Sequence, residues 1–241
     1  MKKIIPLLLF TVLMSCTPEK SPDPAPNPVP SLKLRNIVYA NLRTPFFVTT
    51  NFIYSGDVLL REEGTESTGN TFKAEFNYVN NKLQSQSYYD NGVLSGSTTY
   101  SYTGELITSM LSNESGGIST TNYIYNSNNQ MINEKQFTNG NLDNSNDYEY
   151  NDQGNVSKEL YYSGFTTFEY DTNKNPYSLI YSDALIKVYP IEFSKNNITK
   201  EIQSGGTIKI YEYIYNDSGY PTQIIEKENG VSVTKTTFTY N

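Results

Sequence analysis

Residues 147–163 read DYEYNDQGNVSKELYYS, and this stretch decides the fold. Tyr148 and Tyr150 lie two residues apart, so an extended backbone presents both side chains on the same face. Residues 151–154 supply a turn, because Asn and Asp tolerate tight turns and Gly adopts the left-handed conformation. Val156 then begins a return strand. The stretch therefore predicts one β-hairpin.

The same pattern recurs along the chain about every 23 residues, as nine pairs of aromatic or bulky apolar residues spaced two apart. The pairs are Phe52/Tyr54, Phe76/Tyr78, Tyr100/Tyr102, Tyr123/Tyr125, Tyr148/Tyr150, Phe168/Tyr170, Ile191/Phe193, Tyr213/Tyr215 and Phe238/Tyr240. We therefore predict an all-β domain, an antiparallel meander of about nine hairpin repeats. An open sheet of that length would twist strongly and keep two sticky edges. The meander is thus expected to curl or close into a barrel-like sheet.

Two features refine this domain. The residues between the paired aromatics, such as Asn77, Ser101 and Glu149, are mixed to polar. The aromatic face is therefore predicted to be the buried one, where Tyr offers a large apolar body and a hydroxyl that finds a partner. Residues 175–190, NPYSLIYSDALIKVYP, break the hairpin rhythm. This irregular segment is expected to form a short helical turn or a crossover.

The N-terminus has the layout of an export signal. Lys2 and Lys3 precede an apolar run, and the segment 1–15 is too short for a transmembrane helix. Residues 13–16, Leu-Met-Ser-Cys, resemble a bacterial lipobox, which predicts acylation of Cys16, the only cysteine. The alternative is an ordinary secretory signal whose cleavage site happens to include a cysteine.

Residues 16–30 are rich in proline, and such a segment forms neither helix nor sheet but extends as polyproline II. We predict that it is a tether between the lipid on Cys16 and a repeat domain of residues 31–241. The protein is therefore expected to be a lipid-anchored protein of the outer membrane. Its domain would face the periplasm or the cell surface, and its first partner would be the membrane itself.

Composition excludes several classes of function. The formal charge of −7 argues against nucleic acid as a partner, because phosphates require a basic surface. The absence of His and the single Cys argue against zinc, haem and iron–sulfur sites and against Ser–His–Asp chemistry. Residues 171–175 begin like a calcium loop, but Pro176 stands where that loop needs Gly. We therefore expect no cofactor and no metal.

The Tyr-x-Tyr-Asn-x-x-Gly unit resembles the YD repeats of RHS-type proteins. The domain as a whole resembles a family of Bacteroidetes lipoproteins that is described as having a porin-like barrel fold. The likeness covers residues 51–241 and rests on residues 168–171, 175–177, 196–199 and 215–222. It implies a barrel and an envelope location, and it supplies no catalytic residue.

Two groups of residues are candidates for a site. Tyr88 and Tyr89, like Tyr161 and Tyr162, are adjacent, so one member of each pair must point away from the aromatic face. Such exposed tyrosines are candidate contacts for a glycan or a peptide, although exposed Tyr is also simply favourable in strands.

Glu149, Glu169 and Glu192 occupy equivalent positions in three consecutive repeats and would form an acidic row on the polar face. Their predicted spacing of about 9–10 Å is near that of the carboxylates in inverting glycosidases. A general acid needs a raised pKa, however, and a solvated face does not raise it. We therefore predict a non-enzymatic envelope lipoprotein that binds or scaffolds a glycan or envelope protein. The alternative is a surface glycan or peptidoglycan hydrolase that uses the acidic row.

Overall fold

The structure is a computed structural model that describes residues 32–114 and 116–241. The predicted signal of residues 1–15, the cysteine predicted to be lipidated, Cys16, and the predicted tether of residues 16–30 lie outside the described residues.

Sixteen strands and two short helices make up the described part of the chain. The elements are β1 (Leu34–Asn41), β2 (Phe47–Ser55), β3 (Val58–Glu66), β4 (Thr71–Val79), β5 (Lys82–Asp90), β6 (Val93–Thr103), β7 (Leu106–Glu114), β8 (Gly117–Tyr125), β9 (Met131–Thr138), β10 (Asn141–Tyr150), β11 (Val156–Tyr161), β12 (Gly164–Lys174), the 3-10 helix η1 (Pro176–Leu179), α1 (Asp183–Val188), β13 (Asn196–Gln203), β14 (Ile208–Tyr215), β15 (Pro221–Glu228) and β16 (Val231–Tyr240).

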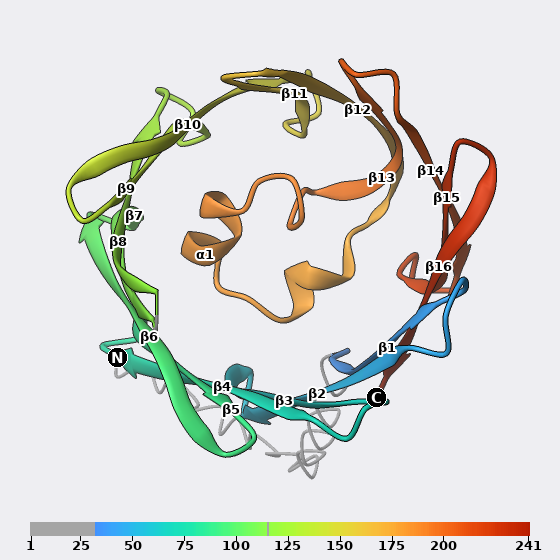
Figure 1. Ribbon diagram of the computed structural model, residues 1–241, viewed down its shortest axis with the longest axis horizontal. Coiled ribbons are helices and arrows are strands. Elements are labelled where there is room, and N and C mark those ends of the chain that lie inside the picture. Colours follow the sequence, from blue (N-terminus) through green and yellow to red (C-terminus); the bar gives the residue numbers. More distant parts are fainter. Residues whose placement is uncertain (1–31, 115) are drawn as a thin grey trace, which may run out of the picture. The chain divides into compact units, whose positions relative to one another are not determined.

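The strands form a closed barrel in which each strand pairs with its neighbours in sequence (Figure 1). Every pairing is antiparallel, and the last strand closes on the first, with Ile37 opposite Phe238 and Val38 opposite Thr237. The predicted all-β meander and its closure are therefore confirmed. Closure removes the two free edges that an open sheet of this length would expose.

The predicted number of repeats is wrong by one. Sixteen strands make eight hairpins, and eight of the nine aromatic pairs lie near the ends of the even-numbered strands. The ninth pair, Ile191/Phe193, lies between α1 and β13, in a segment without strand structure. Its two residues have the spacing of a strand pair, but they follow the two short helices, where the chain has left the sheet.

A β-bulge recurs near the start of each odd-numbered strand from β3 to β15. On β7, for example, Ile107 is opposite Tyr102 and Ser109 is opposite Ser101, so Thr108 has no residue of its own opposite it. The extra residue changes which side chains face inward. After the aliphatic residue at the start of the strand, the next inward residue is the third along instead of the second.

The aromatic face points into the barrel, as predicted. Most first members of the pairs are buried, and they are Phe52, Phe76, Tyr100, Tyr123, Tyr148, Phe168 and Phe238. The second members are half-buried, and several donate a hydroxyl hydrogen bond across to a backbone carbonyl of the preceding strand. Examples are Tyr102 to Leu83 at 2.8 Å and Tyr125 to Ile107 at 2.6 Å. Successive repeats thus share a large inward aromatic ring and a tyrosine hydroxyl that is hydrogen-bonded to the backbone.

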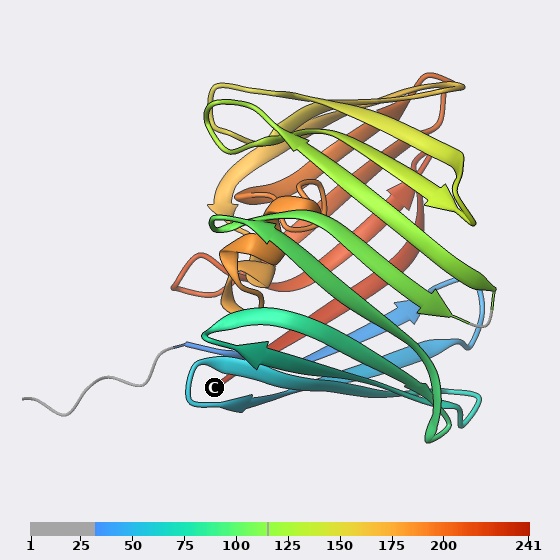
Figure 2. The same cartoon turned by 90° about the vertical axis from the view of Figure 1, so that its left-hand side faces the viewer.

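The segment between β12 and β13, which we call the insert (residues 175–195), lies inside the barrel (Figures 1 and 2). Its apolar side chains Ile180, Leu185 and Val188 are buried in one cluster with the inward aromatics. Asn175 ties its two ends together, because it accepts from the amide of Tyr177 and donates to the carbonyl of Glu192. Neither helix of the described residues is long and apolar enough to cross a membrane.

Candidate functional site

A ring of inward side chains follows from the repeated bulge. The residues three positions after the aliphatic residue of β3, β5, β7, β9, β11 and β13 lie beside the first aromatics of the pairs. These residues are Glu62, Gln86, Met110, Glu134, Glu159 and Glu201. Four of the six are glutamates, so this level of the interior is acidic on two arcs of the wall.

The larger acidic arc borders a cavity of about 440 Å³ between the wall of β9 to β13 and the insert. The cavity is lined by Glu134, Tyr148, Glu159, Thr166, Phe168, Val188, Tyr189, Pro190, Ile191, Glu192, Glu201 and Gln203. Its volume is within the range of about 300–1,000 Å³ that is usual for small-molecule sites. The Tyr-lined interior therefore leaves room for a small ligand beside the insert.

Hydrogen bonds hold the carboxylates of this cavity in place. The Tyr148 hydroxyl donates to Glu134 Oε1 at 2.8 Å. The Asn146 amide nitrogen donates to Glu134 Oε1 at 3.1 Å and to Glu159 Oε1 at 3.2 Å. From the next strand round, the Tyr211 hydroxyl donates to Glu201 Oε1 at 2.7 Å. The cavity therefore offers a ligand carboxylate oxygens whose positions are already fixed by hydrogen bonds.

The environment of the cavity raises the pKa of two of its carboxyls. Desolvation inside the barrel is the main cause for both Glu159 and Glu192, although Glu192 still exposes part of its surface, and the nearby charge of Glu134 adds to the increase. A hydrogen bond from Tyr148 opposes the increase at Glu159. Crowded, desolvated carboxyls hold protons more tightly than free ones, so this cavity favours ligands that donate hydrogen bonds or carry positive charge.

The smaller acidic arc is a single contact between wall and insert. The Tyr181 hydroxyl of the insert donates to Glu62 Oε1 on β3 at 2.6 Å. Burial raises the pKa of Glu62, and the hydrogen bond from Tyr181 opposes that increase. Tyr181 also stacks on Phe193, with ring centroids 4.5 Å apart.

A glutamine at position 62 is expected to make the protein more stable at neutral pH. The folded chain binds the Glu62 proton more tightly than the unfolded chain, whose Glu pKa is about 4.3. The stability from this group is therefore full below that pH and is lost as the pH rises through the folded pKa. Glu62→Gln keeps an acceptor for Tyr181 and should flatten the fall in stability with pH.

Urea unfolding at pH 5 and pH 8 measures this effect. Glu63→Gln is the matched control, because Glu63 lies next along β3 and pairs with Arg61 at 3.0 Å. An equal slope of stability against pH in the wild type and in Glu62→Gln would contradict the prediction.

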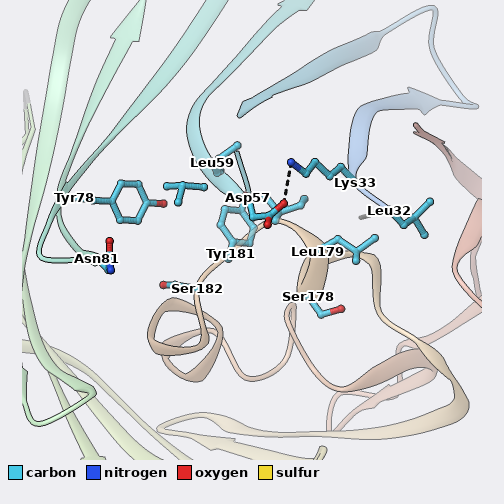
Figure 3. Close-up of a pocket in the computed structure, with 12 residues that line it drawn as sticks. Leu32, Lys33, Asp57, Leu59, Tyr78, Asn81, Ser178, Leu179, Tyr181 and Ser182 are labelled. Carbon is cyan, nitrogen blue, oxygen red and sulfur yellow. Dashed lines mark ion pairs between the residues drawn. The ribbon is translucent and has the colours of Figure 1, made fainter. Parts of the chain in front are cut away.

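A second cavity, of about 400 Å³, lies at the barrel end that carries the turns at residues 56–57 and 80–81. Figure 3 shows Tyr181 and Ser182 of the insert facing Tyr78 of the wall across it. At its mouth Lys33 pairs with Asp57 at 3.0 Å. The lining is mainly apolar and holds no group of carboxyls. This cavity therefore has few groups that could bind a polar ligand.

The first pair of candidate tyrosines is divided between the two faces, as their adjacency predicts. Tyr88 points inward, where its hydroxyl donates to Gln86 Oε1 at 2.6 Å. Tyr89 points outward, where its hydroxyl donates to Glu75 Oε2 at 3.2 Å and Lys73 Nζ lies 4.0 Å from its ring centroid. Both are engaged with the barrel itself, and contact with a ligand stays a prediction.

The second candidate pair lies at the turn between β11 and β12. The Tyr161 hydroxyl donates to the carbonyl of Phe165 at 3.3 Å, and Tyr162 is fully exposed. Both line an outer groove beside β10. They are not near the acidic cavity, so the structure does not join the two candidate pairs into one site.

The predicted acidic row is not a row. Glu149 and Glu169 are exposed on the outer face of β10 and β12, whereas Glu192 belongs to the insert and lines the cavity inside. Glu134, Glu159 and Glu201, which line the cavity, were not predicted from the sequence. The signal for them is a glutamate three residues after the apolar residue near the start of each return strand, and a bulge between the two residues is what turns both inward.

The outer face of the barrel is mixed: exposed apolar side chains such as Leu60, Leu111 and Ile124 stand among polar residues and ion pairs. Lys73 pairs with Glu75 at 2.7 Å, and Lys200 pairs with Glu169 at 3.0 Å. On β6 the outward positions are Ser97, Thr99 and Ser101 between buried inward neighbours.

Asp171 of the calcium-like loop has a structural use instead. Its carboxylate accepts from Tyr215 and from the amide of Asn197. Within residues 32–114 and 116–241, no group of three or more acidic, Cys or His side chains is arranged to hold a metal ion.

The barrel is similar to the crystal structure of a porin-like protein from Bacteroides uniformis ATCC 8492, with a TM-score of 0.60 at 12% identity. The likeness covers 86% of this chain and 96% of that chain. Two further structures, the Photorhabdus luminescens Tc holotoxin pore and TcdB2-TccC3-TEV, give TM-scores of 0.32 and 0.24 at 16% and 15% identity. Each match covers 79% of this chain but only 9% and 10% of theirs. No family model and no curated protein matches the sequence. The chain has a porin-like β-barrel fold, and a likeness at this identity shows the fold alone.

Proposed function

We propose that this protein is a lipid-anchored envelope protein whose barrel stands in water and binds a ligand in the acidic cavity, without catalysing a reaction. The observation that carries the proposal is the orientation of the barrel wall, with aromatics and a cluster of glutamates inside and charged ion pairs among the outward side chains. The porin-like fold is compatible with a place at the outer membrane.

The charged side chains on the outer face argue for water and against lipid. Membrane-spanning barrels carry an apolar band about 25 Å tall on the outside, and a Lys or Arg at its middle costs about 2–4 kcal/mol. Here Arg61, Lys73 and Lys200 occupy outward positions within strands and pair with glutamates. Attachment to the membrane would then come from the acyl chains proposed for Cys16, at about 0.8 kcal/mol per buried CH₂.

Detergent phase partitioning of the full chain, expressed in a bacterium that acylates lipoproteins, tests both halves of the proposal. The wild-type protein should collect in the detergent phase and incorporate labelled fatty acid. Cys16→Ala should incorporate no label and move to the aqueous phase, with its partition ratio changed at least about tenfold.

Ser21→Ala, a change in the predicted tether that leaves Cys16 in place, is the matched control and should behave as the wild type. A Cys16→Ala protein that stayed in the detergent phase would show that the barrel itself is embedded in lipid. Unchanged fatty-acid incorporation would contradict the anchor.

A glycan is the ligand class that we propose for the acidic cavity. Carboxylates accept hydrogen bonds from sugar hydroxyls, and the rings of Tyr148 and Tyr189 offer flat apolar faces. Glu134→Gln and Glu201→Gln should each weaken glycan binding, while Glu149→Gln on the outer face should not. Equal binding by all three variants would place the ligand elsewhere.

A glycan hydrolase remains the second candidate, because the raised pKa values of Glu159 and Glu192 are what a general acid requires. The acidic pair would then lie inside the barrel instead of on Glu149 and Glu169. Release of reducing sugar by the wild type, abolished in Glu159→Gln/Glu192→Gln, would favour the hydrolase. Binding without turnover would favour the binding protein.

A further inference from the structure

The barrel wall has a gap at its rim between β10 and β11. Strand β10 pairs with β9 from Asn141, opposite Thr138, to Asp147. It pairs with β11 only from Asp147, opposite Leu160, onward. Residues 141–146 therefore have a neighbouring strand on the β9 side and none on the β11 side. Backbone groups on that edge are available to another extended chain.

The pairing of β13 with β14 is also short, but there the wall is bridged. The Tyr213 hydroxyl donates to the carbonyl of Ile198 at 2.6 Å, and the Lys174 amide donates to the carbonyl of Gly219 at 3.1 Å. At the β10 edge the contact nearest to the gap is an interior one, from Asn146 to Glu159. The outer half of that edge faces solvent.

A groove of about 470 Å³ runs along this edge on the outside of the barrel. It is lined by Leu142, Asp143, Asn144, Ser145, Asp147, Leu160, Tyr161 and Tyr162. Leu142 is 57% exposed and Tyr162 is fully exposed, so large apolar surfaces flank the open backbone. The lining holds two carboxylates and no basic side chain.

From these features we propose that the β10 edge binds a short, extended, basic peptide segment of a partner protein by strand addition. Free backbone groups give such a segment its hydrogen bonds, and alternate side chains lie on the groove. Asp143 and Asp147 select positive charge, while Leu142 and Tyr162 receive apolar side chains. The site is separate from the acidic cavity, so it does not depend on the ligand proposed there.

The same features argue against a second copy of this chain as the occupant. Antiparallel pairing of two β10 edges would bring Asp143 and Asp147 of one copy beside those of the other, and like charges directly opposite are destabilising. A β-bulge between Leu142 and Asn144 also shortens the regular edge, which suits a short segment better than a long strand.

The test uses the full chain and a fluorescent six-residue peptide of alternating valine and lysine, with binding measured by anisotropy. A peptide with glutamate in place of lysine should bind at least about tenfold more weakly. In a strand, alternate N–H groups point to opposite sides. N-methylation of one alternate set should therefore weaken binding at least about tenfold, and methylation of the other set should change it little.

Asp143→Lys should weaken binding of the lysine peptide at least about tenfold. Asp152→Lys, which makes the same charge change in an exposed turn at the other end of β10, should leave it unchanged. The proposal is overturned if both N-methylated peptides bind as tightly as the parent, or if the glutamate peptide binds equally well. A wild-type dimer in sedimentation that competes with the peptide for binding would assign the edge to a second copy instead.

Discussion

Tyr100→Ala is expected to lower the free energy of unfolding by about 3–5 kcal/mol, the usual cost of removing a large buried aromatic side chain. Only 3% of Tyr100 is exposed, and its ring belongs to the interior cluster that the insert completes. Its hydroxyl donates to Gln86 Oε1 at 2.6 Å, so truncation leaves a cavity and also removes a hydrogen bond to a buried side chain.

Two further variants separate these contributions. Tyr100→Phe keeps the ring and should cost about 1 kcal/mol, since Gln86 Oε1 still accepts from Tyr88. Ser101→Ala changes the exposed neighbour between the paired aromatics and should stay within about 0.5 kcal/mol. Urea unfolding of the three proteins gives the comparison. If Ser101→Ala were the most damaging, the inward and outward faces would have been assigned the wrong way round.

Removal of residues 231–241 should abolish the folded monomer. The deletion takes away β16, which pairs with β1 on one side and β15 on the other. The remaining strands would keep two long unpaired edges, which recruit further chains. Size-exclusion chromatography should therefore show aggregates, and the cooperative thermal transition should be lost.

Adding a synthetic peptide of residues 231–241 during refolding is the matched control. It restores the missing strand without restoring the chain connection, and it should return part of the protein to a monomer-sized species. A truncated chain that stayed monomeric with an unchanged melting temperature would show that closure contributes little to stability.

The closed meander could be predicted because the residues of each repeat indicate where its strands and turns lie. Tyr148 and Tyr150 mark a face, Gly154 marks a turn, and a sheet of so many hairpins has few stable forms other than closure. The count of repeats failed at Ile191/Phe193, where a spacing of two occurs without a strand. Spacing alone cannot distinguish a strand from a turn that follows a short helix.

The candidate site could be predicted only in part. Equivalent positions in the repeats place Glu149, Glu169 and Glu192 in one predicted row, and of these only Glu192 lines the cavity. The bulge on each return strand shifts the inward position by one residue, which is why Glu134, Glu159 and Glu201 were missed. Bulges form through pairing with the neighbouring strand and through sheet curvature, which a single strand does not reveal.

The inward residue that follows each bulge also relates the number of hairpins in the barrel to the side chains of its interior. Each hairpin contributes one arc of wall and one variable side chain, which is Glu in some repeats, Gln at position 86 and Met at position 110. Barrel diameter grows roughly linearly with strand number. Duplication of a hairpin would therefore widen the ring and add one more interior position at once. Single substitutions at these positions could then retune what the interior accepts without altering the wall.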